Sequence, residues 1–152
     1  MLTGVAALLL SEPYVVRGDS MTPSIEPGQR LLVSRVRRVW RRGEVVVVRD
    51  PRDPSARLLK RLVGVPGEEV RLLDGALLVD GELLMESYLG GLPSSLGLGD
   101  RTWALNEDEY MALGDNRTRS TDSRHFGPVP AALIAGRAWF RYWPPREWGR
   151  IA

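Results

Sequence analysis

The chain has 152 residues, of which 43% are hydrophobic and 26% charged. These values are typical of a folded globular chain, so the collagen-like, coiled-coil and globally disordered classes are excluded. The length predicts one domain with a sizeable core. A formal net charge of +2 requires no nucleic-acid partner. The absence of cysteine excludes disulfides, a thiol nucleophile and cysteine-bound zinc, and His125 is the only histidine.

The first ten residues are apolar and include three consecutive leucines at 8–10. A membrane-spanning helix needs about 20 such residues, and here Ser11, Glu12 and Pro13 end the run. The positively charged start of a secretory signal is also absent. Residues 1–13 therefore fit three interpretations: the remnant of a membrane anchor, an interfacial segment, or a first core element. We place a single folded domain at residues 14–152.

A candidate nucleophile follows the strand predicted at residues 14–17. Ser20 lies in the sequence Gly18-Asp19-Ser20-Met21-Thr22-Pro23-Ser24. The glycine lets a substrate backbone approach closely. Ser20 is therefore either an ordinary loop serine or an exposed nucleophile, and a serine hydroxyl attacks only when a base takes its proton.

Three valine- and leucine-rich runs of strand length come next, at residues 30–36, 44–49 and 57–65. Around the gap between the first two lies a basic stretch, formed by Arg35, Arg37, Arg38, Arg41 and Arg42. It is either a solvated connection or a contact for anionic lipid headgroups. Nucleic-acid binding is the weaker interpretation, because no aromatic residues are interleaved with the arginines.

The third run contains Lys60, the only lysine of the chain. A lysine can lose its proton inside a protein, whereas an arginine effectively cannot. Burial in an apolar strand lowers a lysine pKa from its reference value of about 10.4 by several units. The chain thus holds two candidate bases for Ser20, which are Lys60 in a Ser-Lys arrangement and the more usual histidine, His125.

The remainder of the chain again predicts β structure. Asp-Gly pairs separate three apolar runs, which indicates a meander of hairpins. A long loop follows, and one helical turn is expected between Pro130 and Gly136. The strands are predicted at residues 69–73, 76–79, 82–85, 103–105, 109–113 and 137–143, and the loop at residues 87–101. We therefore predict a mainly β fold, in which folded-over antiparallel sheets form a barrel or sandwich with little helix.

Two further segments allow alternative interpretations. Residues 114–124 are almost free of apolar side chains, so they form either a surface loop or a buried polar network between strands. The aromatic residues near the carboxyl end form either part of the core or a membrane-interface surface, where tryptophan and tyrosine concentrate. This aromatic cluster consists of Trp139, Phe140, Tyr142, Trp143 and Trp148.

Three segments, in this order, resemble the signal peptidase I family. Ser-Met-Thr-Pro at residues 20–23 resembles the segment that holds the nucleophile. Lys-Arg-Leu-Val-Gly-Val-Pro-Gly-Glu at residues 60–68 resembles the segment that holds a lysine base. Gly-Asp-Asn-Arg at residues 114–117, with the polar residues up to Arg124, resembles the closing polar segment. The resemblance covers the chain from about Tyr14 to Trp143.

The resemblance implies a role for each matching residue. Ser20 attacks the scissile carbonyl, Lys60 accepts its proton, and Ser120 orients the lysine amine. Asp122 and Arg124 form a supporting ion pair. The Ser20 backbone N–H supplies one oxyanion donor, whereas Gly18 stands where some members carry a serine hydroxyl, so the second donor is not identified.

The resemblance also implies an activity: a serine endopeptidase that removes signal peptides from exported preproteins after small residues, without metal or cofactor. Its partners are preprotein signal peptides and the lipid surface, with no nucleic acid, at the outer face of the cytoplasmic membrane. The alternatives are a conjugation-type peptidase, a self-cleaving repressor-type Ser-Lys peptidase, and a β-barrel binding module without activity. No Ala-Gly or Cys-Gly pair for self-cleavage precedes Ser20.

Overall fold

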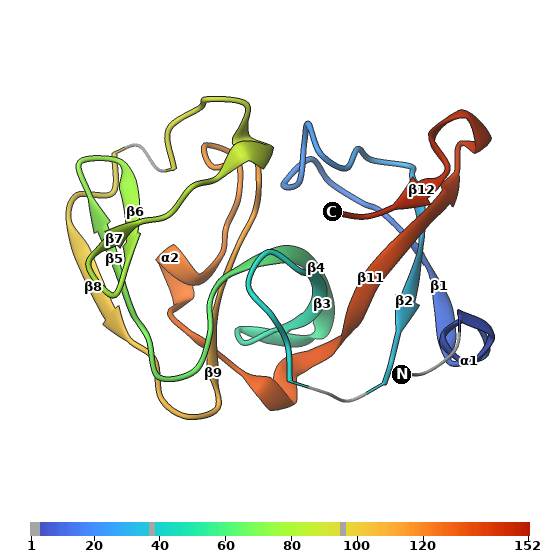
Figure 1. Ribbon diagram of the computed structural model, residues 1–152, viewed down its shortest axis with the longest axis horizontal. Coiled ribbons are helices and arrows are strands. Elements are labelled where there is room, and N and C mark those ends of the chain that lie inside the picture. The colour runs from blue at the N-terminus through green and yellow to red at the C-terminus, as the bar shows by residue number, and fades with distance from the viewer. Residues whose placement is uncertain (1–3, 37–38, 95–96) are drawn as a thin grey trace.

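Two antiparallel sheets lie side by side in the computed structural model, which describes residues 4–36, 39–94 and 97–152 (Figure 1). The larger sheet has the strand order β1-β2-β11-β3-β4-β9-β10, with β12 beside β11, and the smaller sheet has the order β7-β6-β5-β8. The strands are β1 Ser11–Val15, β2 Arg30–Ser34, β3 Val45–Asp50, β4 Asp53–Gly64, β5 Glu69–Leu73, β6 Ala76–Val79, β7 Glu82–Leu83, β8 Arg101–Ala104, β9 Glu109–Leu113, β10 Val129–Pro130, β11 Ile134–Trp143 and β12 Gly149–Arg150. The predicted mainly β fold is confirmed.

Helical segments are short and few in the described part of the chain. They are α1 Gly4–Leu9, α2 Ser123–Phe126, and the 3-10 turns η1 Ser87–Leu89, η2 Ala131–Leu133 and η3 Pro145–Glu147. None of the described helices is long and apolar enough to cross a membrane. The helical turn expected at residues 130–135 is therefore present but shorter, because Ile134 already pairs with Val48 at the start of β11.

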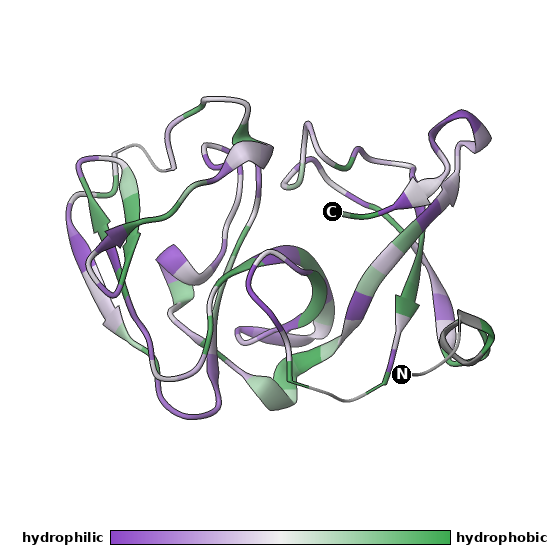
Figure 2. Ribbon diagram, viewed as in Figure 1, coloured by the Kyte–Doolittle hydropathy of each residue, from purple (hydrophilic) through white to green (hydrophobic). Residues whose placement is uncertain are grey.

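The valine run of β3 is buried on both faces of the larger sheet. Val45 and Val47 pack into one hydrophobic cluster with Leu59, while Val46 and Val48 pack into a second cluster with Leu62. A strand covered on both sides is expected to read as a continuous apolar run rather than an alternating one. Figure 2 shows this hydrophobic colouring through the curled centre of the sheet.

Pairing between strands changes several of the predicted boundaries. The strands predicted at 69–73, 76–79 and 109–113 have the predicted bounds, and the first two form the expected hairpin. β4 begins four residues before the predicted run because the tight hairpin with β3 pairs Asp50 with Asp53. β1 covers Ser11–Val15 rather than residues 14–17, since its ladder with β2 pairs Ser11 with Ser34.

The amino-terminal helix α1 exposes apolar side chains. Val5, Leu8 and Leu9 are 68%, 54% and 79% exposed, so these side chains do not belong to the core. Residues 1–3 of the predicted 1–13 segment lie outside the described residues. The remaining interpretations, an interfacial segment or the remnant of an anchor, both agree with an exposed apolar surface.

Candidate active site

Ser20 and Lys60 meet although 40 positions separate them in the chain. Lys60 lies in β4, and Ser20 lies in the turn that follows β1. The Lys60 Nζ atom is 2.9 Å from the Ser20 Oγ atom, within hydrogen-bond distance. At this distance a neutral lysine amine is able to accept the proton of the serine hydroxyl.

The surroundings of Lys60 favour its neutral form. Its side chain is only 2% exposed. Burial lowers the Lys60 pKa to about 8, and the nearby Arg124 acts in the same direction, whereas the negative charge of Asp122 opposes the change. A lysine with this pKa is partly unprotonated near neutral pH, as a general base requires.

Asp122 organises the polar segment beside Ser20 and Lys60. Its Oδ2 atom accepts bonds from the Ser120 hydroxyl at 2.8 Å, the Gly114 amide at 3.0 Å and Arg124 Nη2 at 2.8 Å. Its Oδ1 atom accepts from Arg124 Nε at 2.8 Å. Burial by itself would raise the pKa of this carboxyl, but the bonds and charge of Arg124 hold the Asp122 pKa below its usual value.

Ser120 has a different partner from the one that the resemblance implies. Its hydroxyl donates to Asp122, and among the described residues the Lys60 amine bonds only Ser20 Oγ. A carboxylate is a stronger acceptor than an amine, which explains this choice. The segment is nevertheless a buried polar network rather than a surface loop, since Ser120, Asp122 and Arg124 are all at most 7% exposed.

Asn116 and Gly114 hold the turn that contains Ser20, and sequence reasoning did not single them out for this role. The Asn116 amide donates to the Ser20 carbonyl at 2.9 Å, and its side chain donates to Asp19 O and to Thr22 Oγ1. A Cβ atom on Gly114 would lie 2.5 Å from the Ser20 carbonyl oxygen and 2.2 Å from Ser120 Oγ. Only glycine therefore fits between the turn and Ser120.

A second buried charge network braces the same loop from the other side. Arg61 donates to both carboxylate oxygens of Asp115 and lies over the ring of Tyr88, 4.1 Å from its centroid. Arg117 donates from Nε to the Gly114 carbonyl at 2.9 Å and pairs with Glu86. Tyr88 belongs to η1, so the predicted loop at 87–101 has local structure at its start. Residues 95–96 of this loop lie outside the described part of the chain.

The His125 side chain takes part in a capping box at the start of the short helix α2. Its Nδ1 atom accepts the backbone N–H of Asp122 at 3.2 Å, which completes a capping box at the start of α2. Within the described residues, the hydrogen-bonded partner of the Ser20 hydroxyl is Lys60. The geometry thus favours Lys60 over His125 as the base.

The backbone N–H of Ser20 donates to no acceptor among the described residues. An unpaired donor on the candidate nucleophile is suited to bind the oxyanion of a tetrahedral intermediate. Gly18 is exposed and has a φ of +74°, a left-handed conformation that glycine adopts without strain.

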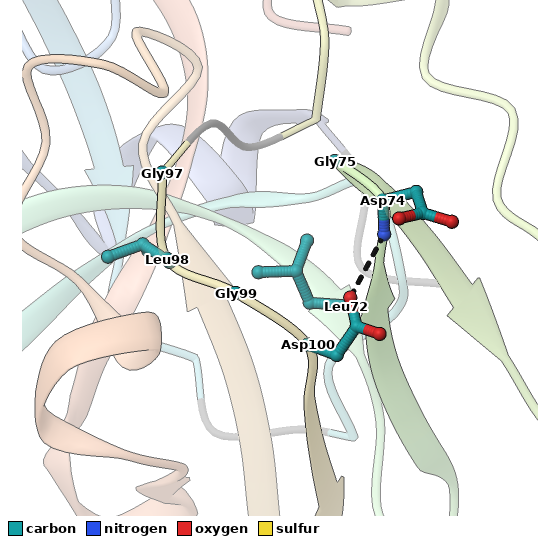
Figure 3. A pocket seen from close by; sticks show the side chains of 7 residues that line it. All are labelled: Leu72, Asp74, Gly75, Gly97, Leu98, Gly99 and Asp100. Carbon is teal, nitrogen blue, oxygen red and sulfur yellow. Dashed lines mark hydrogen bonds between the residues drawn. The ribbon is translucent and has the colours of Figure 1, made fainter.

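The smaller sheet has a hollow of its own, of about 260 Å³, lined by Leu72, Asp74, Gly75 and residues 97–100 (Figure 3). The Asp74 backbone N–H donates to Asp100 Oδ1 there at 3.2 Å. No serine, lysine or histidine lines this hollow. Across the described residues, no three His, Cys, Asp or Glu side chains converge as a metal site would need.

The basic stretch and the aromatic cluster have mixed environments. Arg42 pairs with Glu68, and Arg35 pairs with Glu12, while Arg37 and Arg38 lie outside the described residues.

None of the five residues of the aromatic cluster belongs to the buried core. Trp143 and Trp148 are 48% and 65% exposed, which argues against a core cluster and leaves the interface interpretation open.

Comparison with known proteins identifies one family. The sequence profile of the family "Signal peptidase, peptidase S26" matches residues 1–143. The chain is 34% identical over 143 residues to a probable signal peptidase I-2 of Synechocystis, covering 89% of this chain and 64% of that protein. It is 33% identical to a signal peptidase I of Bacillus licheniformis, covering 91% of this chain and 80% of the relative.

A solved structure agrees with the sequence matches. The crystal structure of a signal peptidase I from Enterococcus faecalis is similar with a TM-score of 0.57 and 33% sequence identity. The similarity covers 67% of this chain and 98% of that chain.

Proposed function

The chain belongs to the signal peptidase I family, and from this premise we propose that it removes signal peptides from exported preproteins, cutting after small residues. The observation that supports this most directly is the 2.9 Å contact between Lys60 Nζ and Ser20 Oγ. The relatives are named as signal peptidases, which favours this activity over a self-cleaving repressor or a conjugation-type peptidase.

In the proposed mechanism Ser20 Oγ attacks the carbonyl carbon of the scissile bond while its proton passes to Lys60 Nζ. The carbonyl oxygen becomes an oxyanion, which the Ser20 backbone N–H binds. The tetrahedral intermediate then collapses, and Lys60 returns the proton to the leaving amine. A water molecule, deprotonated by Lys60, hydrolyses the ester and releases Ser20.

Ser120, Asp122 and Arg124 serve as supporting residues in this proposal. Asp122 bonds both Ser120 and the Gly114 amide, so it sets the position of the loop that contacts the nucleophile turn. Its charge also opposes the loss of the Lys60 proton, and Arg124 offsets that effect. Asp122 and Arg124 thereby help to hold the Lys60 pKa close to the working pH.

We place the activity at the outer face of the cytoplasmic membrane, with preprotein signal peptides and the lipid surface as partners. The exposed apolar side chains of α1 and the exposed Trp143 and Trp148 support contact with lipid. The mechanism uses only side chains and backbone groups of the chain, without a cofactor or metal, and nothing in it involves nucleic acid.

Incubation with a purified preprotein tests the proposed activity. We expect one cut, located by mass spectrometry directly after a small residue such as alanine. Ser20→Ala should remove this cleavage because no other hydroxyl is bonded to the Lys60 amine among the described residues. Equal cleavage by the Ser20→Ala protein would assign the nucleophile elsewhere.

The pH dependence of kcat/KM reports which base acts. Since Lys60 must be unprotonated and its pKa is about 8, we expect kcat/KM to rise about tenfold per pH unit below that value and to level off above it. His125→Ala should leave the profile in place, whereas a pH dependence that disappears in this variant would contradict the assignment.

A further inference from the structure

In the larger sheet β1 and β4 each leave one edge unpaired, and we call the line along which side chains join these two edges the seam. β1 pairs only with β2, and β4 pairs only with β3 from Asp53 to Lys60, since its ladder with β9 begins at Arg61. In the described residues, the remaining edge of each strand therefore has no strand partner. Unpaired strand edges bind extended peptides through main-chain hydrogen bonds.

Two side-chain contacts close the seam at separate points. One is the catalytic pair, Lys60 to Ser20. The other joins Arg57 of β4 to Glu12 of β1, with Nη1 and Oε1 3.1 Å apart. Arg57 precedes Lys60 by three residues, so the two contacts lie about 10 Å apart along β4.

The second contact lies on the apolar side of the seam. Successive side chains of a strand alternate between its faces, so Arg57 shares a face with Leu59, and Glu12 shares a face with Tyr14. Leu59 belongs to a buried hydrophobic cluster against which Tyr14 packs. The ion pair therefore adjoins a floor of apolar side chains. Arg57 and Arg17 also act on Tyr14, where they oppose the rise in pKa that burial causes.

From this arrangement we infer that the Glu12–Arg57 ion pair determines specificity, by reading the charge of the third or fourth substrate residue before the cut. The inference rests on the proposed function, in which recognition depends on the residues before the scissile bond. An extended peptide that reaches Ser20 along the edge of β4 passes this pair three to four residues earlier. Glu12 also bonds Arg35, so these three side chains together bear one net positive charge.

The net charge of these three side chains predicts which substrate charge is preferred and which substitution reverses that preference. The wild-type protein should favour aspartate over lysine at that substrate position. In Arg57→Glu the three side chains have one net negative charge, so lysine should be favoured. Adding Glu12→Arg to that variant restores both the ion pair and the positive charge. Arg57 and Arg35 side chains are 48% and 62% exposed, so the effect is limited by solvent screening.

The experiment compares kcat/KM for three peptides that differ only in having alanine, aspartate or lysine at the fourth residue before the cut, and for a second set varied at the third. We expect the aspartate-to-lysine ratio to be about 3 in the wild type at one of these positions. In Arg57→Glu it should fall about tenfold, and in the double variant it should recover. Arg71→Glu, an equal change of charge at an exposed site on β5, should leave the ratio as in the wild type.

Each result bears on one of the two claims. If the wild type cleaves the alanine peptide but the ratio is the same in all four proteins, the ion pair does not read substrate charge, while the proposed peptidase activity stands. If the wild type cleaves no peptide and no preprotein, the proposed function fails and the inference with it. Circular dichroism checks folding, and Arg57→Gln, which should bring the ratio close to one, is a milder second variant.

Discussion

Replacing Lys60 with arginine should lower kcat/KM for preprotein cleavage by at least about 10⁴-fold, the range seen when one member of a catalytic constellation is lost. The amine is 2.9 Å from the Ser20 hydroxyl and 2% exposed, so no water is expected to replace it efficiently as the base. An arginine keeps the positive charge but cannot release its proton. The measurement is a progress curve with a preprotein, followed by gel or mass spectrometry.

The size of arginine in a buried position calls for a second variant. Lys60→Met keeps the volume and removes the charge, and it should be equally inactive. It should also be no less stable than the wild type at pH 7, because burying a charged amine is costly and the thioether avoids this cost. Substantial cleavage by a folded Lys60→Met or Lys60→Arg protein would rule out Lys60 as the base.

Asp122→Asn should produce the largest loss of stability among the conservative changes considered. The carboxylate is 0% exposed, and its partner Arg124 has a side chain that is 1% exposed. Removing one charge of a buried ion pair is strongly destabilising and costs about 3–5 kcal/mol. The lost acceptor strength also weakens the bonds to Ser120 and to the Gly114 amide. Urea unfolding at pH 7 measures the difference in free energy.

Asp50→Asn is the matched control for this change. Asp50 is also a buried carboxylate bonded by an arginine, but the side chain of its partner Arg52 is 52% exposed. Water is able to solvate Arg52 after the change, so we expect a loss of only about 1 kcal/mol. Equal losses for the two variants would mean that the burial of Arg124 does not determine the cost.

Local patterns were sufficient to predict several strands. The Asp-Gly pair at residues 74–75 and the flanking apolar runs predicted the hairpin of β5 and β6 with its bounds. This works because the turn type and the alternation of side chains are properties of a few neighbouring residues. The candidate base followed from composition, since Lys60 is the only lysine and stands in an apolar strand.

The boundaries of other elements depended on partners far away in the chain. β1 extends to Ser11 because Ser34 pairs with it, and no local signal at Ser11 predicts a strand. Likewise the short helix α2 was not predicted, because its capping box needs the His125 ring to turn back toward the Asp122 amide. Such pairings are long-range or depend on rotamers, so periodicity in a short window does not reveal them.

The sequence by itself determined the residue types available for chemistry: one lysine, one histidine, no cysteine, and a serine after a glycine turn. Only the tertiary structure brought Lys60 to Ser20 and placed the His125 ring in the capping box of α2, away from the Ser20 hydroxyl. It also decided that the polar segment is buried and that Asn116 holds the nucleophile turn. The physical reason is that a hydrogen bond and a desolvated amine depend on distance and burial, which arise only when strands that are remote in sequence pack together.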